Sequence, residues 1–217
     1  LGAGSDSVRG SGSGGGDLFR PGAGADTIVG GGGDDRLIID VADLGASDSF
    51  NGGGGTDRLE VLGSWTLSTG TGALAGVAGF EGFTFGVNGD GARNLTVTAA
   101  YASTLAGPVL IEVGSGQSQP LTVQAGSLSA AHPLLGTSNL GTSADLFTGG
   151  AAADSLAGGG GTDTLMGGGG NDSLEGGAGF DTARYAGPPS NHQLQNLGGA
   201  IYVLDRTGSE GRDSLRA

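Results

Sequence analysis

Residues 158–175 read Gly-Gly-Gly-Gly-Thr-Asp-Thr-Leu-Met followed by Gly-Gly-Gly-Gly-Asn-Asp-Ser-Leu-Glu, two consecutive copies of one nine-residue pattern. In both copies a glycine-rich run precedes an aspartate, and an apolar residue follows two positions later. The pattern is Gly-Gly-x-Gly-x-Asp-x-(apolar)-x. Self-similarity at a fixed short period is the signature of a stacked repeat fold. The pattern returns at residues 30–38 and 52–60, and looser copies begin at Leu1, Gly12, Pro21, Leu140, Gly149 and Gly176.

The aspartates keep this period most clearly. In a second block of repeats they lie nine residues apart, and in a first block the intervals are 11, 9, 9, 13 and 9. The alternative interpretation is a metal-free glycine-rich solenoid or a flexible linker, and we rank it lower because a linker would not keep an aspartate and an apolar residue in one register. The aspartates are Asp6, Asp17, Asp26, Asp35, Asp48 and Asp57 in the first block, and Asp145, Asp154, Asp163, Asp172 and Asp181 in the second.

The spacing predicts a turn followed by a short strand in each repeat. Six glycine-rich residues form the turn, because glycine reaches positive φ without a Cβ penalty. The remaining three form a strand whose middle residue points inward. Alternate turns then lie on opposite edges, so one edge recurs every 18 residues and Asp145, Asp163 and Asp181 stack. Stacked carboxylates repel, and a hard cation bound by carboxylates and turn carbonyls relieves the repulsion. Calcium accepts six to eight such oxygens in flexible geometry, which ranks it above magnesium.

The repeat resembles the RTX (repeats-in-toxin) family, whose nonapeptide has this same pattern. The resemblance implies an all-β fold, a right-handed parallel β-roll or β-solenoid with several Ca²⁺ ions bound in its glycine-rich turns. In the family each ion lies between two turns on one edge. Its ligands are the carbonyls at positions one and three and the aspartate of one turn, with the carbonyls at positions two and four and the aspartate of the next.

Carried onto this sequence, the resemblance implies the following calcium ligands. One site takes Gly149, Ala151 and Asp154 with Gly168, Gly170 and Asp172. Another takes Gly158, Gly160 and Asp163 with Gly177, Gly179 and Asp181. In the first block, Gly12, Gly14 and Asp17 face Gly31, Gly33 and Asp35, and Gly30, Gly32 and Asp35 face Gly53, Gly55 and Asp57. The remaining implied metal residues are Asp6, Gly22, Gly24, Asp26, Asp145, Gly159 and Gly161.

Four segments follow from the pattern. Residues 1–60 are the first calcium-binding block and 140–184 the second. Residues 61–139 lose the motif and nearly all charge, and alternating runs such as Asn-Leu-Thr-Val-Thr (94–98) predict strands there. These strands either continue the solenoid as wider coils or form an inserted antiparallel sandwich; we favour continuation. Only a turn at residues 99–105 is a candidate for helix.

Residues 185–217 predict a truncated β-hairpin cap. A strand over residues 200–205 is expected to pair with a weaker strand over 191–197 across Gly198-Gly199, and residues 211–215 follow. A solenoid needs its last coil covered, because an exposed coil is a template for pairing.

Two expectations concern surface contacts. Residues 61–139 form a nearly uncharged face, and Trp65, Phe80, Phe83 and Phe85 make it a candidate docking surface for a protein partner or larger assembly. Alternatively, these aromatic side chains fill the coil interior. Arg36 and Arg58 occupy the same repeat position and are expected to pair with turn carboxylates.

Composition excludes several function classes. The chain has 51 glycines in 217 residues, a net charge of −13, no lysine and no cysteine. Without cysteine there is no disulfide framework or thiolate metal site, and without lysine no Schiff-base or P-loop lysine chemistry. The acidic chain should not bind nucleic acid. It has no apolar run long enough to span a membrane, and no zincin or nucleophile-elbow motif.

The sequence therefore predicts a calcium-binding, non-catalytic segment of a secreted or cell-surface bacterial protein, extracellular or periplasm-facing. It would act as a structural spacer, a surface or adhesin segment, or an accessory subunit. The alternative is an accessory module of a secreted protease, lipase or polysaccharide-modifying enzyme whose catalytic domain lies elsewhere. We interpret the chain as a piece of a longer exported protein, and the resemblance implies type I secretion.

Overall fold

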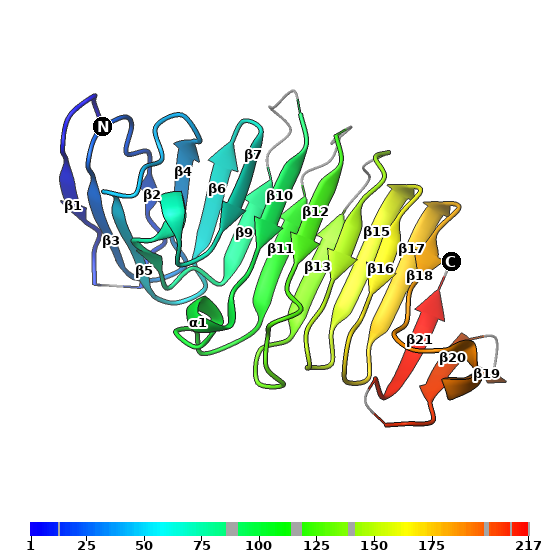
Figure 1. The fold of residues 1–217 in the computed structure, drawn as a ribbon. Coiled ribbons are helices and arrows are strands. Elements are labelled where there is room, and N and C mark those ends of the chain that lie inside the picture. Colours follow the sequence, from blue (N-terminus) through cyan, green and yellow to red (C-terminus); the bar gives the residue numbers. More distant parts are fainter. Residues whose placement is uncertain are drawn as a thin grey trace.

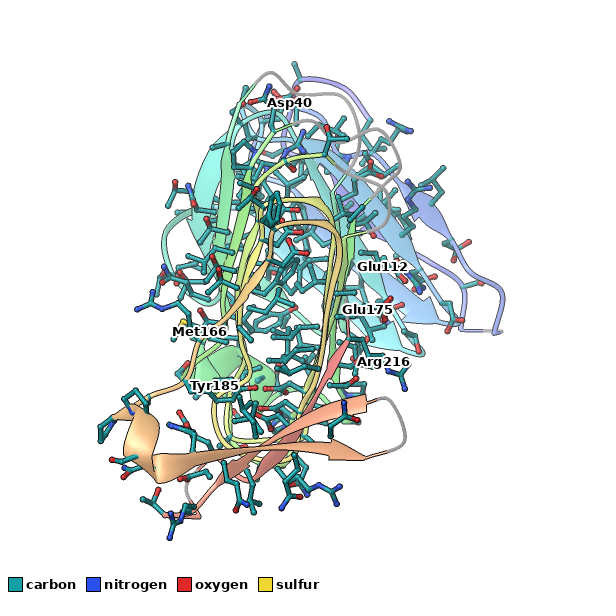
Figure 2. All side chains as sticks on the ribbon, turned by 90° about the vertical axis from the view of Figure 1, so that its right-hand side faces the viewer. Asp40, Glu112, Met166, Glu175, Tyr185 and Arg216 are labelled. Atoms are coloured by element: carbon teal, nitrogen blue, oxygen red, sulfur yellow. The ribbon has the colours of Figure 1, made fainter. Side chains whose placement is uncertain are left out.

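The computed structural model of the chain describes residues 1–12, 14–85, 91–113, 119–138, 142–197, 200–208 and 210–216. The described chain is nearly all β, and its strands stack along one axis so that the two termini lie at opposite ends (Figure 1). The long parallel sheets are those of a parallel β-roll, as the sequence predicts. The view along the axis shows the chain passing back and forth between two layers, with side chains filling the space between them (Figure 2).

One layer is an eleven-stranded sheet. Every neighbouring pair in it is parallel except β19–β20 and β20–β21. In spatial order its strands are β19 (His192–Leu197), β20 (Ala200–Asp205), β21 (Arg212–Arg216), β17 (Ser173–Gly179), β15 (Ser155–Gly161), β13 (Leu134–Ser138), β11 (Val109–Val113), β9 (Gly82–Phe85), β6 (Arg58–Leu62), β4 (Arg36–Asp40) and β2 (Leu18–Phe19).

The other layer consists of two parallel sheets. A four-stranded sheet contains β1 (Ser7–Arg9), β3 (Thr27–Gly32), β5 (Ser49–Gly54) and β8 (Val77–Ala78). A six-stranded sheet contains β18 (Thr182–Ala183), β16 (Thr164–Met166), β14 (Leu146–Thr148), β12 (Leu121–Gln124), β10 (Arg93–Thr96) and β7 (Trp65–Ser68). The helices are short: η1 (Gly72–Leu74), α1 (Ala99–Ala102) and η2 (Pro189–Asn191). No described helix is long and apolar enough to cross a membrane.

The core is formed by the apolar side chains at the eighth position of each repeat. Strand register aligns the inward residues of successive rungs, so each apolar side chain packs on the equivalent one in the next coil. Gly136 interrupts this ladder at β13, where the ring of Phe147 occupies the space that a Cβ would need. The aligned inward residues in the eleven-stranded sheet are Leu37, Leu59, Phe83, Ile111, Gly136, Leu156, Leu174 and Leu215.

Residues between the two repeat blocks form rungs of the same sheets. Strands β7, β10 and β12 stack onto β14, while β9, β11 and β13 stack onto β15. These coils are wider and enclose aromatic rings, with Tyr101 on α1 donating a hydrogen bond to the Phe80 carbonyl at 2.8 Å. The turn expected at residues 99–105 begins with this one-turn helix, whose N-cap Thr98 accepts a hydrogen bond from the Tyr101 amide.

Of the two interpretations of the aromatic residues in this segment, the one in which they fill the coil interior is confirmed for the side chains described, and the one that makes them a docking surface is wrong. Trp65, Phe80 and Phe83 are 7%, 2% and 3% exposed, and they pack in the core. The physical reason is that a wider coil has more interior to fill, and aromatic rings are the largest apolar groups available. The side chain of Phe85 lies outside the described residues.

The two arginines also pair differently from the expectation. Arg36 binds Glu60 and Arg58 binds Glu112, all on the outward face of the eleven-stranded sheet, so the partners are strand residues and not turn carboxylates. Arginine at the first strand position points away from the turn, toward the adjacent rungs.

The C-terminal segment contains the predicted hairpin and one further rung. Strands β19 and β20 pair antiparallel, as expected, although Gly198 and Gly199 lie outside the described residues. Residues 212–216 do not simply follow the hairpin, because they form β21, which returns to the roll and pairs parallel with β17. In that register Leu215 aligns with Leu174, so the hairpin is an excursion between two successive rungs.

Candidate metal centre

Aspartates stack in ladders along both edges of the roll. In each ladder the backbone amide of one aspartate donates a hydrogen bond to Oδ1 of the next, over 2.7–2.9 Å. The stacking of Asp17 with Asp35, and of Asp145 with Asp163 and Asp181, is thereby confirmed. The four ladders are Asp6–Asp26–Asp48, Asp17–Asp35–Asp57, Asp145–Asp163–Asp181 and Asp154–Asp172–Asp213.

The second carboxylate oxygen is left without a partner in half of the twelve ladder aspartates. Oδ2 is buried and accepts no hydrogen bond in six aspartates of the described chain. A buried, unsatisfied charged oxygen is costly, so each position calls for a cation. The ion pairs found among the described residues are Arg36–Glu60, Arg58–Glu112 and His192–Glu210, and none includes one of these six. The six are Asp6, Asp26, Asp35, Asp57, Asp163 and Asp172.

Glycine at the first repeat position makes room for this oxygen. A Cβ on Gly30, Gly158 or Gly167 would collide with the Oδ2 of the aspartate in the same turn. The carboxylate therefore folds back over its own turn, and any larger residue would displace it. Equivalent contacts occur at Gly52, Gly149 and Gly176.

Backbone carbonyls line the same gap between stacked turns. The oxygens of Gly150 and Ala152 lie beside Gly168 and Gly170 of the next turn, both of which have positive φ. The Gly167 oxygen lies beside Gly149 in the earlier turn. Carbonyls facing the gap thus come from positions two and four of the earlier turn and position one of the later. The family resemblance implied the reverse: carbonyls at positions one and three of the earlier turn and at two and four of the later turn. The choice of carbonyl ligands stays a prediction.

Five of the ladder carboxylates have raised pKa values. Burial raises the pKa of Asp172 to about 7 and those of Asp57 and Asp213 to about 6, and neighbouring acids add to the effect. Burial also raises the pKa values of Asp154 and Asp163. Without a cation the stacked turns therefore hold protons that free carboxyl groups would release.

The Asp17–Asp35–Asp57 ladder shows where counting along the sequence misplaces a turn. Counting back from Asp17 makes Gly12 the first residue, yet Gly10 has the contacts of a first residue, with the Asp17 carboxylate and the Gly30 carbonyl. Two extra residues therefore lie inside this turn. Gly22 and Gly24 have positive φ and lie beside the carbonyls of Gly2 and Gly4. A calcium role for Gly12, Gly14, Gly22 and Gly24 stays a prediction.

Three ladder residues were missed as site residues. Asp48 completes the Asp6–Asp26 ladder beyond an insertion. Glu81 replaces the aspartate after Asp57, because its Oε2 accepts the Asp57 amide at 2.9 Å. Asp213 completes the Asp154–Asp172 ladder. The Gly211-x-Asp213-x-Leu215 spacing could have revealed Asp213, whereas Glu81 has no glycine-rich turn before it.

The donor set fits calcium. No group of three or more histidine, aspartate or glutamate side chains among the described residues is arranged to hold a metal alone, so backbone oxygens are needed. Two carboxylates and several carbonyls per gap supply only hard oxygen ligands, in a flexible turn geometry. Calcium takes such ligands, whereas zinc prefers histidine and cysteine.

Comparison with known proteins supports this assignment over part of the chain. A family model for the RTX calcium-binding nonapeptide repeat (4 copies) matches residues 11–38 and 148–183. These ranges include parts of the ladders in both blocks. No curated protein matches the chain.

Proposed function

Because the chain contains RTX calcium-binding nonapeptide repeats, which are typical of secreted bacterial proteins, we propose that calcium folds it outside the cell. The observation that carries this proposal is the set of six buried aspartate oxygens without a partner. Calcium bound by these oxygens and the adjacent carbonyls would replace repulsion within each ladder by attraction.

The free energy of calcium binding expected for such sites is large enough to drive folding. Extracellular calcium modules bind with dissociation constants of roughly 10⁻⁴–10⁻³ M, so the cytosol leaves them empty and the exterior fills them. At a free concentration ten times the dissociation constant, each site adds about 1.4 kcal/mol. About five sites would then contribute about 7 kcal/mol, comparable with the whole stability of a typical domain, ~5–15 kcal/mol.

Far-UV circular dichroism tests the proposal. In excess chelator at pH 8 the chain should show a coil spectrum, and added calcium should restore the β signal. Magnesium at the same concentration is the control and should restore little, because it retains its own waters. A chain that stays fully β in chelator would contradict calcium-driven folding.

The role we propose is structural and non-catalytic: a spacer, a surface or adhesin segment, or an accessory subunit of a larger assembly. An elongated stack with its termini at opposite ends suits a spacer between two attachments (Figure 1). The mass of the intact native polypeptide, with identification of its copurifying proteins, is the test. A catalytic domain on the same polypeptide would support an enzyme accessory module instead.

A further inference from the structure

We propose that Asp213 forms a calcium site with Asp172, and that this site fastens the C-terminal hairpin β19–β20 to the roll. This inference rests on the proposed calcium function. It extends that function to residues beyond the matched repeats, which end at residue 183.

Backbone register places the Asp213 turn as the next rung after the Asp172 turn. Ser173, Leu174 and Glu175 of β17 pair in parallel with residues 214–216 of β21. The Ser214 amide donates to the Asp172 carbonyl at 2.8 Å, as the Ser173 amide does to Asp154 one rung earlier. The two turns therefore stack as matched repeats do, although 41 residues separate the two aspartates where matched rungs are 18 apart.

The carboxylates repeat the ladder geometry. The Asp172 amide donates to Asp213 Oδ1 at 2.8 Å, the same distance as from Asp154 to Asp172. Asp172 and Asp213 are 3% and 1% exposed. Oδ2 of Asp172 is buried and has no partner, so an unsatisfied anionic oxygen lies in the gap between the two turns.

The turn backbone also matches the earlier sites. Gly211 has φ +76 and lies against the Gly170 carbonyl, just as Gly170 lies against that of Ala152. The Arg212 amide donates to Asn171 Oδ1 at 2.8 Å, and the Thr56 amide makes the same contact with Asp34 in the first block. The contacts at positions four and five and the aspartate Oδ1 contact thus coincide with those of the repeat turns, whereas Gly208 at position one has no atom within 4 Å of a Cβ.

This position gives the metal a mechanical role for the hairpin. After β18, which ends at Ala183, the chain leaves the roll, forms β19 and β20, and returns at β21. Local contacts hold the excursion together, including His192 Nε2 with Glu210 Oε2 at 2.7 Å. The return to the roll, however, brings Asp213 onto Asp172 with no cationic side chain between them among the described contacts. A calcium ion there converts a repulsive junction into an attractive one, so the hairpin docks only when calcium is bound.

The test compares Asp213→Asn with the control Glu175→Gln in the full chain. Asparagine keeps an oxygen that can accept the Asp172 amide, so only the charge is lost. Glu175 is exposed on β17, and its variant removes the same charge away from the turns. Native mass spectrometry counts bound calcium, and hydrogen exchange measures protection of residues 192–205.

Asp213→Asn should bind one ion fewer than the wild type, and the hairpin should lose about tenfold in calcium-dependent protection while β13 and β15 keep theirs. Glu175→Gln should match the wild type. An unchanged ion count in Asp213→Asn would overturn the site, and a lost ion with unchanged hairpin protection would overturn the fastening. A wild type that binds no calcium would overturn the proposed function itself.

A second measurement applies if Asp213→Asn does not fold. Burial raises the pKa of Tyr185, and the nearby Asp213 carboxylate raises it further. The Tyr185 ring therefore lies close to the proposed site. Terbium in place of calcium should therefore emit through Tyr185, and Tyr185→Phe should lose this emission while retaining calcium-induced folding. Equal terbium emission from the wild type and Tyr185→Phe would contradict an ion at this junction.

Discussion

At the residue scale, each ladder aspartate divides its two oxygens between two tasks. In all of them except Asp6 and Asp17, which begin their ladders, Oδ1 accepts a backbone amide from the preceding rung, and this bond fixes the register of the coil. Oδ2 lies over its own turn without a protein partner in six of the rungs described. One side chain therefore specifies both the fold and the cation site, which explains why the aspartate position is the least variable of the repeat.

An interior aspartate should matter more than a terminal one. Asp163 is fully buried and hydrogen-bonded to rungs on both sides, through Asp145 and Asp181, so it can serve two ions. Asp6 is bonded to Asp26 in the first ladder. Asp163→Asn should raise the calcium midpoint of folding by about tenfold, equivalent to ~1.4 kcal/mol, and more than Asp6→Asn does. Calcium titrations followed by circular dichroism measure this, and equal shifts would argue against shared sites.

Neighbouring glycines should tolerate alanine very differently. Gly53 has φ +110 and faces the Gly31 carbonyl, so Gly53→Ala should cost roughly 1–3 kcal/mol or more. A Cβ on Gly54, one residue later, would meet only the Gly31 oxygen at an ordinary contact distance of 3.9 Å, and Ala151 and Ala178 hold the same repeat position. Gly54→Ala should change stability by less than about 0.5 kcal/mol. Denaturant melts in saturating calcium compare the two, and similar losses would show that φ does not decide the outcome.

At the element scale, the middle rungs depend on their neighbours. Strands β8 and β9 pair in parallel with β5 and β6 on one side, and β12 and β13 pair in parallel with β14 and β15 on the other. An isolated 61–139 fragment should therefore be unfolded and show little hydrogen-exchange protection, because its outermost coils lose their partners. The full chain is the control. A cooperatively folded and protected fragment would show that this segment is an independent domain.

The sequence predicted the features that the nine-residue period defines. It did not predict the ladder residues in coils that depart from this period. The turns, the inward apolar residues and the stacking of Asp145, Asp163 and Asp181 follow from the period, and the structure confirms them. Glu81 and Asp213 were missed because their coils contain 24 and 41 residues, and strand pairing, not local sequence, sets their register. The burial of Trp65 and Phe83 likewise depends on how wide a coil becomes.

At the scale of the whole molecule, acid should stabilise the calcium-free roll. The pKa values of Asp57, Asp172 and Asp213 are raised from 3.8 to about 6, 7 and 6. Between about pH 4 and pH 7 the folded state therefore binds more protons than the unfolded state, and the free energy of unfolding falls as the pH rises. In chelator, the chain should be more stable at pH 5 than at pH 8.

Calcium should reverse this dependence, since it binds the ionised carboxylates and competes with protons. With calcium present, stability should be greater at pH 8 than at pH 5. Thermal melts at both pH values, with and without chelator, provide the measurement. Greater stability at pH 8 in chelator would mean that the ladder carboxylates are not protonated in the folded chain.

The position of the two termini at opposite ends of the stack determines how the molecule responds to tension (Figure 1). A pull on the ends acts along the axis and parts one coil from the next, because interstrand hydrogen bonds lie in that direction. A coil of 18 residues advances the stack by about 4.8 Å when folded and spans about 60 Å when extended. Under load the chain would lengthen in separate steps, because each coil would absorb work before the next one unfolds. It would then act as an extensible tether whose stiffness depends on the bound ions.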